Sequence, residues 1–194
     1  MSVKLLIYLC VAFSPLISGL SDGERSDIVN SHNGYRANVR PEAADMLDMT
    51  YHAAAEKTAQ SWASQCKKLT HDSFANMKDS KYGYCGQNIF VSSAQMPWTK
   101  AVEAWHSEVS QFTYNSTQNN FADIGHYTQV VWATSHKVGC GYAKCRDARG
   151  VFHNYVCNYC PAGNFQGQIN TPYKQGKKCS ACPESCLPNG LCTP

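Results

Sequence analysis

The sequence predicts an α+β fold, in which helices pack on a small, largely antiparallel sheet and a small disulfide-rich segment follows. Helical periodicities come first along the chain, and two strand-like runs joined by a turn come after them. The third observation is the cysteine distribution, because ten of the 11 cysteines lie after residue 60. So many cysteines without an obvious metal-binding pattern are typical of exported proteins that carry disulfides.

The first 20 residues have the features of a secretory signal peptide. Lys4 supplies a positive start, residues 5–13 form an apolar run too short to span a bilayer, and Ser18 and Gly19 offer a cleavage site. Cleavage would remove Cys10 and leave ten cysteines, the even number that a full disulfide set requires. An uncleaved anchor is the alternative. We expect a secreted, extracellular protein with no membrane-spanning segment after the leader.

The first predicted helix begins at Ser21, which forms a capping box pattern with Glu24. Its apolar positions follow helical spacing as far as Pro41, which ends the pattern. The positions are Ile28, His32, Tyr35 and Val39. We expect His32 to be a packed or surface histidine.

Two further helices are predicted in the middle of the chain. The positions of the second are Tyr51, Ala55, Ala59, Trp62, Cys66 and Leu69. The positions of the third are Trp98, Val102, Trp105, Val109 and Phe112, which form an amphipathic stripe after Pro97. Residues 70–85 are polar and irregular, and 88–91 are a short strand candidate. The third helix ends near Asn115, which begins an N-glycosylation sequon.

The C-terminal half begins with a short predicted helix at residues 126–132. Two runs rich in β-branched and aromatic residues follow at 138–144 and 151–159, and Gly150 closes the turn between them. This pattern predicts a β-hairpin. From residue 171 the composition changes to Pro, Lys and Cys, so that this tail has no room for a core and depends on its own disulfides. We therefore divide the chain into a signal peptide (1–20), a main domain (21–170) and a cysteine-rich hinge (171–194).

Several of these segments resemble the signatures of the CAP superfamily and its cysteine-rich secretory proteins. Residues 125–132 (Gly-His-Tyr-Thr-Gln-Val-Val-Trp) are similar to the first signature, and 155–165 (Tyr-Val-Cys-Asn-Tyr-Cys-Pro-Ala-Gly-Asn-Phe) to the second. Residues 85–90 (Cys-Gly-Gln-Asn-Ile-Phe) resemble a third family segment, and 105–109 its helix signature. The resemblance covers about residues 25–170 and implies an α-β-α sandwich for the main domain.

The tail resembles the hinge of vertebrate cysteine-rich secretory proteins. Those proteins normally continue into an ion-channel regulatory domain, and we expect a truncated member that lacks it, because this chain stops at Pro194. Spacing alone leaves the disulfide pairing open. The resemblance implies the pairs Cys66–Cys145, Cys85–Cys160, Cys140–Cys157, Cys179–Cys186 and Cys182–Cys192.

The resemblance also implies a cleft built from two histidines and two glutamates. The matching positions here are His71, Gln87, Glu108 and His126, so that glutamine replaces one glutamate. A neutral amide cannot act as a general base. His71 and His126 could still hold Zn²⁺ weakly, although no cofactor is required. A structural hydrogen-bonded cleft, a weak metal site and a catalytic site stay open, and we predict no catalytic residues.

The predicted function is binding rather than catalysis. A net charge of +3 with no basic run excludes nucleic acid as a partner class. The resemblance implies a secreted, non-enzymatic signalling protein that acts on a cell-surface receptor, and specifically a sperm chemoattractant in fertilisation. The alternatives are a metal-dependent hydrolase using His71, Glu108 and His126, and a carrier of a small sterol or lipid.

Overall fold

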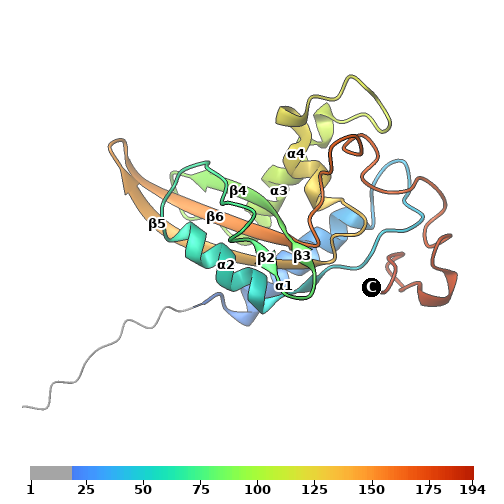
Figure 1. The fold of residues 1–194 in the computed structure, drawn as a ribbon, viewed down its shortest axis with the longest axis horizontal. Coiled ribbons are helices and arrows are strands. Elements are labelled where there is room, and N and C mark those ends of the chain that lie inside the picture. Colours follow the sequence, from blue (N-terminus) through green and yellow to red (C-terminus); the bar gives the residue numbers. More distant parts are fainter. Residues whose placement is uncertain (1–18) are drawn as a thin grey trace, which may run out of the picture.

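The computed structural model describes residues 19–194, which form an α-β-α sandwich followed by a short tail (Figure 1). The predicted α+β class is confirmed by this architecture. The predicted signal peptide lies outside the described residues, apart from its last two positions. No helix within residues 19–194 is long and apolar enough to cross a membrane.

A four-stranded sheet in the order β1-β5-β6-β4 forms the middle layer. Its strands are β1 (Thr50–Tyr51), β4 (Gly86–Ser92), β5 (Lys137–Asp147) and β6 (Gly150–Cys160). The predicted hairpin is confirmed as β5 and β6, which pair antiparallel, and Gly150 adopts a φ of 121° at their turn. Strand β4 pairs antiparallel with β6, whereas β1 pairs parallel with β5 and was not predicted.

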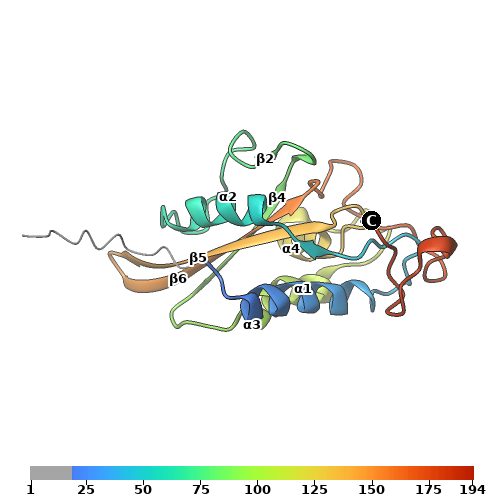
Figure 2. The same cartoon turned by 90° about the horizontal axis from the view of Figure 1, so that it is seen from below.

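Helices cover both faces of the sheet. Figure 2 shows α2 (Ala53–Ala63) on one side and α1 (Asp22–Arg36) and α3 (Trp98–Ser107) on the other. The main hydrophobic core lies under α1 and α3, where α4 (Phe121–Val130) also packs. The remaining elements are short: the β2–β3 ribbon (Lys78–Asp79 and Gly83–Tyr84) and the 3-10 turns η1 (Glu108–Gln111) and η2 (Pro183–Ser185).

Helix α1 begins as predicted, because Ser21 and Glu24 exchange both hydrogen bonds of a capping box. It ends at Arg36, whose guanidinium is buried with only 1% of the residue exposed. The guanidinium donates five hydrogen bonds, to the carbonyl oxygens of Leu47, Val130, Trp132 and Ala133. Three of these carbonyls lie at and after the end of α4, where a positive charge is favourable. Arg36 therefore fastens α4 and the segment around Leu47 to α1.

Helix α2 is shorter at both ends than the apolar spacing predicts. Tyr51 lies in β1, while Cys66 and Leu69 adopt left-handed conformations with φ of 56° and 50° after the helix has ended. The helix lies directly on β5 because Gly139 and Gly141 leave room for its backbone. A Cβ atom at Gly141 would lie 2.3 Å from the backbone of Gln60.

The C-terminal tail is hydrogen-bonded to the segment that follows α1. The amide of Cys192 donates to Met46, and its carbonyl accepts from Asp48. Leu191 and Tyr173 belong to the main hydrophobic core, with 0% and 3% of each residue exposed. The tail therefore packs on the sandwich in addition to carrying its own bridges.

Five disulfides join the ten cysteines in the described part of the chain. They are Cys66–Cys145, Cys85–Cys160, Cys140–Cys157, Cys179–Cys186 and Cys182–Cys192, the pairs that the family resemblance implies. Cys140 and Cys157 are direct cross-strand partners in the hairpin. The other two bridges of the sandwich fasten the ends of loop 64–85 to the β5–β6 hairpin.

Candidate functional site

A polar cleft of about 180 Å³ lies where α4 meets β4 and the loop that contains His71. Its lining residues are His71, Gln87, Asn88, Phe121, Ala122, Gly125, His126 and Asn164. Three of the four predicted positions therefore lie around one cavity. The fourth, Glu108, does not line the cavity and lies behind His126.

The carboxylate of Glu108 is held by α4. Glu108 is the first residue of η1. Its carboxylate accepts hydrogen bonds from the backbone N–H groups of His126 and Tyr127 at 2.9 and 3.0 Å. Its second oxygen lies 2.6 Å from Nδ1 of His126. Because a carboxylate oxygen accepts, Nδ1 of the neutral His126 imidazole carries the proton and donates it. Nε2 of His126 is therefore the nitrogen with a free lone pair.

The amide of Gln87 is oriented by a chain of hydrogen bonds from α2. The hydroxyl of Thr58 donates to the carbonyl of Ala55, so it accepts from the amide nitrogen of Asn158 at 2.9 Å. Oδ1 of Asn158 then faces Nε2 of Gln87 at 3.0 Å and accepts from it. This direction leaves Oε1 of Gln87 pointing to the loop that carries His71.

That oxygen accepts two hydrogen bonds from the His71 loop. Nδ1 of His71 lies 3.1 Å away, and the backbone N–H of Asp72 lies 3.0 Å away. Because an amide oxygen can only accept, Nδ1 of His71 is the protonated nitrogen. Nε2 of His71, like that of His126, therefore keeps its lone pair.

The two histidines are arranged like metal ligands whose ring orientation is fixed by a hydrogen bond on the nitrogen that does not bind the metal. In each, the Nδ1–H group is held by an acceptor and Nε2 is available, as in many histidine-ligated sites. The described residues supply no third histidine, cysteine or acidic ligand beside them. Among residues 19–194 no cluster of three histidine, cysteine or acidic side chains lies within ligating distance except Cys179, Cys182 and Cys192, which are in disulfides. The donor set fits a metal bound by two imidazoles and water.

Other candidates for catalysis are not brought to the cleft. Ser73 is exposed, and its hydroxyl is within hydrogen-bonding distance of the backbone N–H of Asn76 and of no histidine in the described residues. His32 is fully buried and hydrogen-bonds Tyr159, so it is the packed histidine of the two alternatives that we expected. His153 is hydrogen-bonded to Tyr142 on the hairpin. The described structure therefore contains no nucleophile and base in contact at the cleft.

Sequence reasoning missed the asparagines that frame the cleft. Asn88 donates to the carbonyl of His126, and Asn164 accepts from Thr128 and donates to Gly125. Asn158 orients Gln87 as described above. All three lie inside the segments 85–90 and 155–165 that carry the resemblance. Their place in those segments was the signal that could have pointed to them.

A comparison with protein families decides the identity of the fold. The family model described as "CAP: Cysteine-rich secretory protein family" matches residues 29–159, which include β4, α4 and all of the hairpin except Cys160. The chain belongs to the cysteine-rich secretory protein family. Proteins of this family are generally secreted signalling proteins.

Curated relatives of the family cover most of this chain. Cysteine-rich secretory protein 3 of Equus caballus is 45% identical over 172 residues, which are 87% of this chain and 68% of the relative. Cysteine-rich secretory protein 2 of Cavia porcellus is 42% identical over 183 residues, which are 94% of this chain and 73% of the relative. The secretory relatives and the five disulfides agree with the expected extracellular location.

Solved structures show the same sandwich. "Crystal structure of NaASP2 with Zn2+" matches with a TM-score of 0.75 and 32% identity, over 91% of this chain and 98% of that chain. "Structure of BmVAL-1" matches with a TM-score of 0.76 and 25% identity, over 94% and 99% of the two chains. Both matches extend well beyond the site and confirm the predicted CAP fold.

Proposed function

We propose that this cysteine-rich secretory protein is a non-enzymatic signalling ligand that acts on a cell-surface receptor. The specific role is that of a sperm chemoattractant in fertilisation, with the receptor on the sperm. The resemblance of the tail to the hinge of vertebrate members supports this role. In this proposal residues 1–20 are the leader and the exposed sequon at Asn115 carries a glycan.

The observation that best supports a non-enzymatic function is the hydrogen-bond chain through Asn158 to Gln87. It orients a neutral amide at the position that corresponds, by the family resemblance, to one of the two glutamates of the cleft. None of the described residues that line the cleft carries a carboxylate, and that of Glu108, behind His126, is already engaged by three donors. A carboxylate engaged in this way is a poor base for activating water.

A weak zinc site at His71 and His126 accompanies this role without being required for it. The similar NaASP2 structure is titled as containing Zn²⁺, and both histidines here keep a free Nε2. Zinc would supply Lewis acidity when bound. The residues of this chain hold the two imidazoles in orientation, through Gln87 on one side and Glu108 on the other.

The experiment is a sperm chemotaxis assay with the purified protein and its His71→Ala/His126→Ala variant. A ligand whose signal lies on its exterior attracts sperm equally well in both forms. Complete loss of attraction by a variant with native thermal stability would show that the cleft, and not the exterior, is needed for the function. Turnover of peptides or esters that disappears in Glu108→Gln would establish the hydrolase instead.

A further inference from the structure

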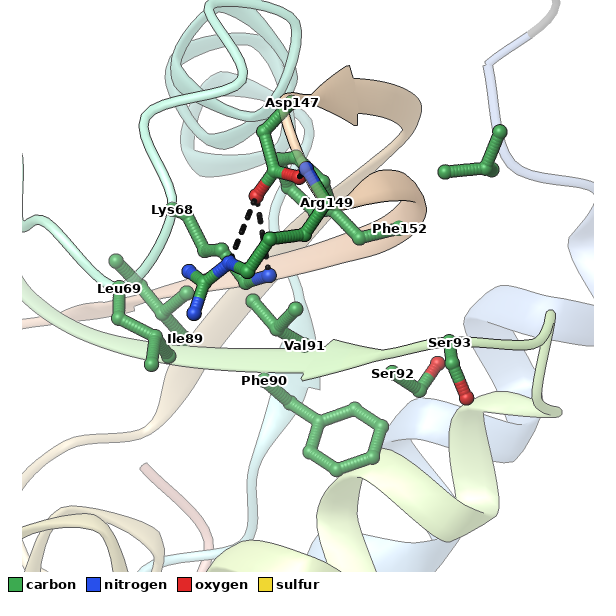
Figure 3. Close-up of a pocket in the computed structure, with 11 residues that line it drawn as sticks. Lys68, Leu69, Ile89, Phe90, Val91, Ser92, Ser93, Asp147, Arg149 and Phe152 are labelled. Carbon is green, nitrogen blue, oxygen red and sulfur yellow. Dashed lines mark hydrogen bonds and ion pairs between the residues drawn. The ribbon is translucent and has the colours of Figure 1, made fainter.

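A second hollow lies on the α2 side of the sheet, away from the cleft that holds the two histidines. Its volume is about 500 Å³, and we call it the edge groove. It lies between residues 68–69, strand β4 and the β5–β6 turn (Figure 3). The side chains that the argument uses are Lys68, Leu69, Ile89, Val91, Arg149 and Phe152.

The groove borders an unpaired edge of the sheet. Strand β4 is the last strand in the order β1-β5-β6-β4, so one of its edges faces away from β6. Within the described residues, no backbone group of 88–92 makes a hydrogen bond outside the β4–β6 ladder. A strand edge with free N–H and C=O groups is a template for pairing with another strand.

The side chains of β4 alternate in a way that suits strand addition. Figure 3 shows Ile89 and Val91 pointing into the groove and Phe90 pointing to the opposite face. There Phe90 packs on Tyr155, at a ring distance of 5.7 Å. A strand added beside β4 would place every second side chain in the groove, next to Ile89 and Val91.

Leu69 forms an exposed apolar wall of the groove. It adopts a φ of 50°, a conformation that a leucine rarely takes, and 65% of its surface is exposed. Such backbone strain persists where the surroundings enforce it and is concentrated at functional sites. The Cys66–Cys145 bridge anchors this turn on β5 and thereby holds Leu69 over the groove.

The rim of the groove carries an excess of positive charge. Nζ of Lys68 lies 3.3 Å and Nε of Arg149 lies 4.0 Å from the same oxygen of Asp147. Lys68 also lies over the ring of Phe152, at 4.8 Å. Since one carboxylate is shared by two cations, an additional anion is favoured at this rim.

We propose that the edge groove docks an extended acidic segment of a partner protein, which adds as a strand to β4. The free edge supplies the backbone hydrogen bonds, and Leu69, Ile89 and Val91 accept apolar side chains from alternate positions. Lys68 and Arg149 attract an acidic residue of the segment. The proposal rests on the proposed function insofar as both require a protein partner, and it names the surface and the chemistry of that partner.

Other occupants fit the groove less well. A neutral lipid would use the apolar wall but would leave the charged rim and the strand edge without partners. A second copy of this chain, paired through β4, would bring two positive rims to one interface. An acidic extended segment uses all three features together.

The experiment measures fluorescence anisotropy with a labelled seven-residue probe, acetyl-Thr-Val-Thr-Val-Thr-Glu-Thr-amide. Two further probes carry N-methyl groups on the odd or on the even residues. Because only alternate N–H groups of an added strand face β4, one set should weaken binding about tenfold or more while the other has little effect. A fourth probe, with lysine in place of glutamate, should bind about tenfold more weakly than the parent.

The matched protein variants are Arg149→Glu and Arg146→Glu. Both residues are exposed, Arg146 near the end of β5 and Arg149 in the following turn, but only Arg149 lines the groove. Arg149→Glu should weaken binding of the parent probe about tenfold, and Arg146→Glu should not. Equal effects of the two methylated probes, equal effects of the two variants, or no binding at millimolar probe would overturn the proposal.

Two other results would also overturn it in favour of another occupant. Self-association of the protein that the probe reverses, measured by sedimentation velocity, would assign the edge to a second copy. Displacement of the probe by neutral lipid vesicles would assign the groove to lipid. All these measurements use purified protein without cells, so their failure leaves the chemotaxis result intact and distinguishable.

Discussion

Nε2 of Gln87 lies 3.0 Å from Oδ1 of Asn158 and donates a hydrogen bond to it. This contact is the middle of a chain that starts at Ala55 in α2 and ends at His71 in the cleft. The chain has a fixed direction because the carbonyl of Ala55 can only accept. The cleft is therefore suited to an amide at position 87. A glutamate there would place a carboxylate oxygen opposite Oδ1 of Asn158, which is also an acceptor.

The first prediction concerns Gln87→Glu. A glutamate would face Oδ1 of Asn158, so we expect the free energy of unfolding to fall by about 1 kcal/mol. Zinc affinity should rise, because an anion then lies behind Nδ1 of His71. Thermal denaturation and calorimetric titration measure both effects, with Gln118→Glu on the exposed loop as the control. Zinc affinity at or below that of the natural protein would show that residue 87 does not act on His71.

The second prediction concerns zinc binding to the two histidines. Protons and zinc compete for Nε2 of His71 and His126, so affinity should fall steadily as the pH is lowered below neutrality. Either His71→Ala or His126→Ala should abolish binding, whereas Ser73→Ala, which removes a hydroxyl two residues from His71, should not. Calorimetric titration at several pH values provides the measurement. Zinc binding that survives in the double alanine variant would place the ion elsewhere.

The third prediction concerns the buried imidazole of His32. Burial lowers the pKa of His32 from 6.5 to about 4. Its Nδ1–H donates to Ile28, and its Nε2 accepts from the hydroxyl of Tyr159, so the folded protein holds it neutral. As the pH falls, His32 is protonated in the unfolded chain before it is protonated in the folded protein. The free energy of unfolding that His32 contributes above pH 6.5 is therefore lost between pH 6.5 and pH 4. The loss is about 3 kcal/mol.

Urea denaturation at pH 7 and pH 4.5 measures this loss. In His32→Gln the side chain cannot titrate in this range, so the same interval should show a smaller loss of stability. An unchanged loss in that variant would assign the acid sensitivity to other groups.

The fourth prediction concerns the contact between α2 and β5. Gly141→Ala would place a Cβ atom 2.3 Å from the backbone of Gln60, so the helix must move away from the strand. We expect a loss of about 3 kcal/mol or more, because overpacking here displaces backbone. Gly34→Ala in α1 is the matched control. It meets nothing within 4 Å and should stabilise the protein by about 0.5 to 1 kcal/mol. Similar unfolding midpoints for the two variants would contradict the packing described.

The fifth prediction concerns Arg36. In Arg36→Lys three donors replace five, and some of the carbonyls at the end of α4 lose their partner. A loss of about 2 to 4 kcal/mol is expected, since buried acceptors are left unsatisfied. Arg40→Lys, whose side chain is 71% exposed, should leave stability nearly unchanged. Differential scanning calorimetry of both variants makes the comparison, and a shift shared by both would remove the special role of Arg36.

Local patterns predicted the elements whose signals are contained within a few residues. The capping box of Ser21, the amphipathic stripe after Pro97 and the hairpin turn at Gly150 are all of this kind. The left-handed turn at Cys66 and Leu69 was not predicted, because both residues also fit the helical spacing. The disulfide of Cys66 and the packing of α2 on β5 decide the conformation there.

Contacts between distant segments were beyond the reach of local patterns. The parallel pairing of Thr50 with Lys137 and the docking of Cys192 on Met46 depend on the whole fold. The positions of His71, Gln87, Glu108 and His126 came from the family resemblance. The hydrogen-bond direction at Gln87 and His71 depends on Thr58 and Asn158, and it follows from side-chain contacts that no local sequence pattern indicates.

The attachment of the tail to the sandwich affects what a deletion of the tail can show about the proposed function. Removing residues 171–194 would take Tyr173 and Leu191 out of the core and would leave the carbonyl of Met46 and the amide of Asp48 without their partners on Cys192. Loss of chemoattraction in such a shortened protein would therefore be ambiguous, because a distorted sandwich and a missing receptor-binding surface would give the same result. Point changes on the outward face of the tail, such as Lys177→Glu, separate the two explanations.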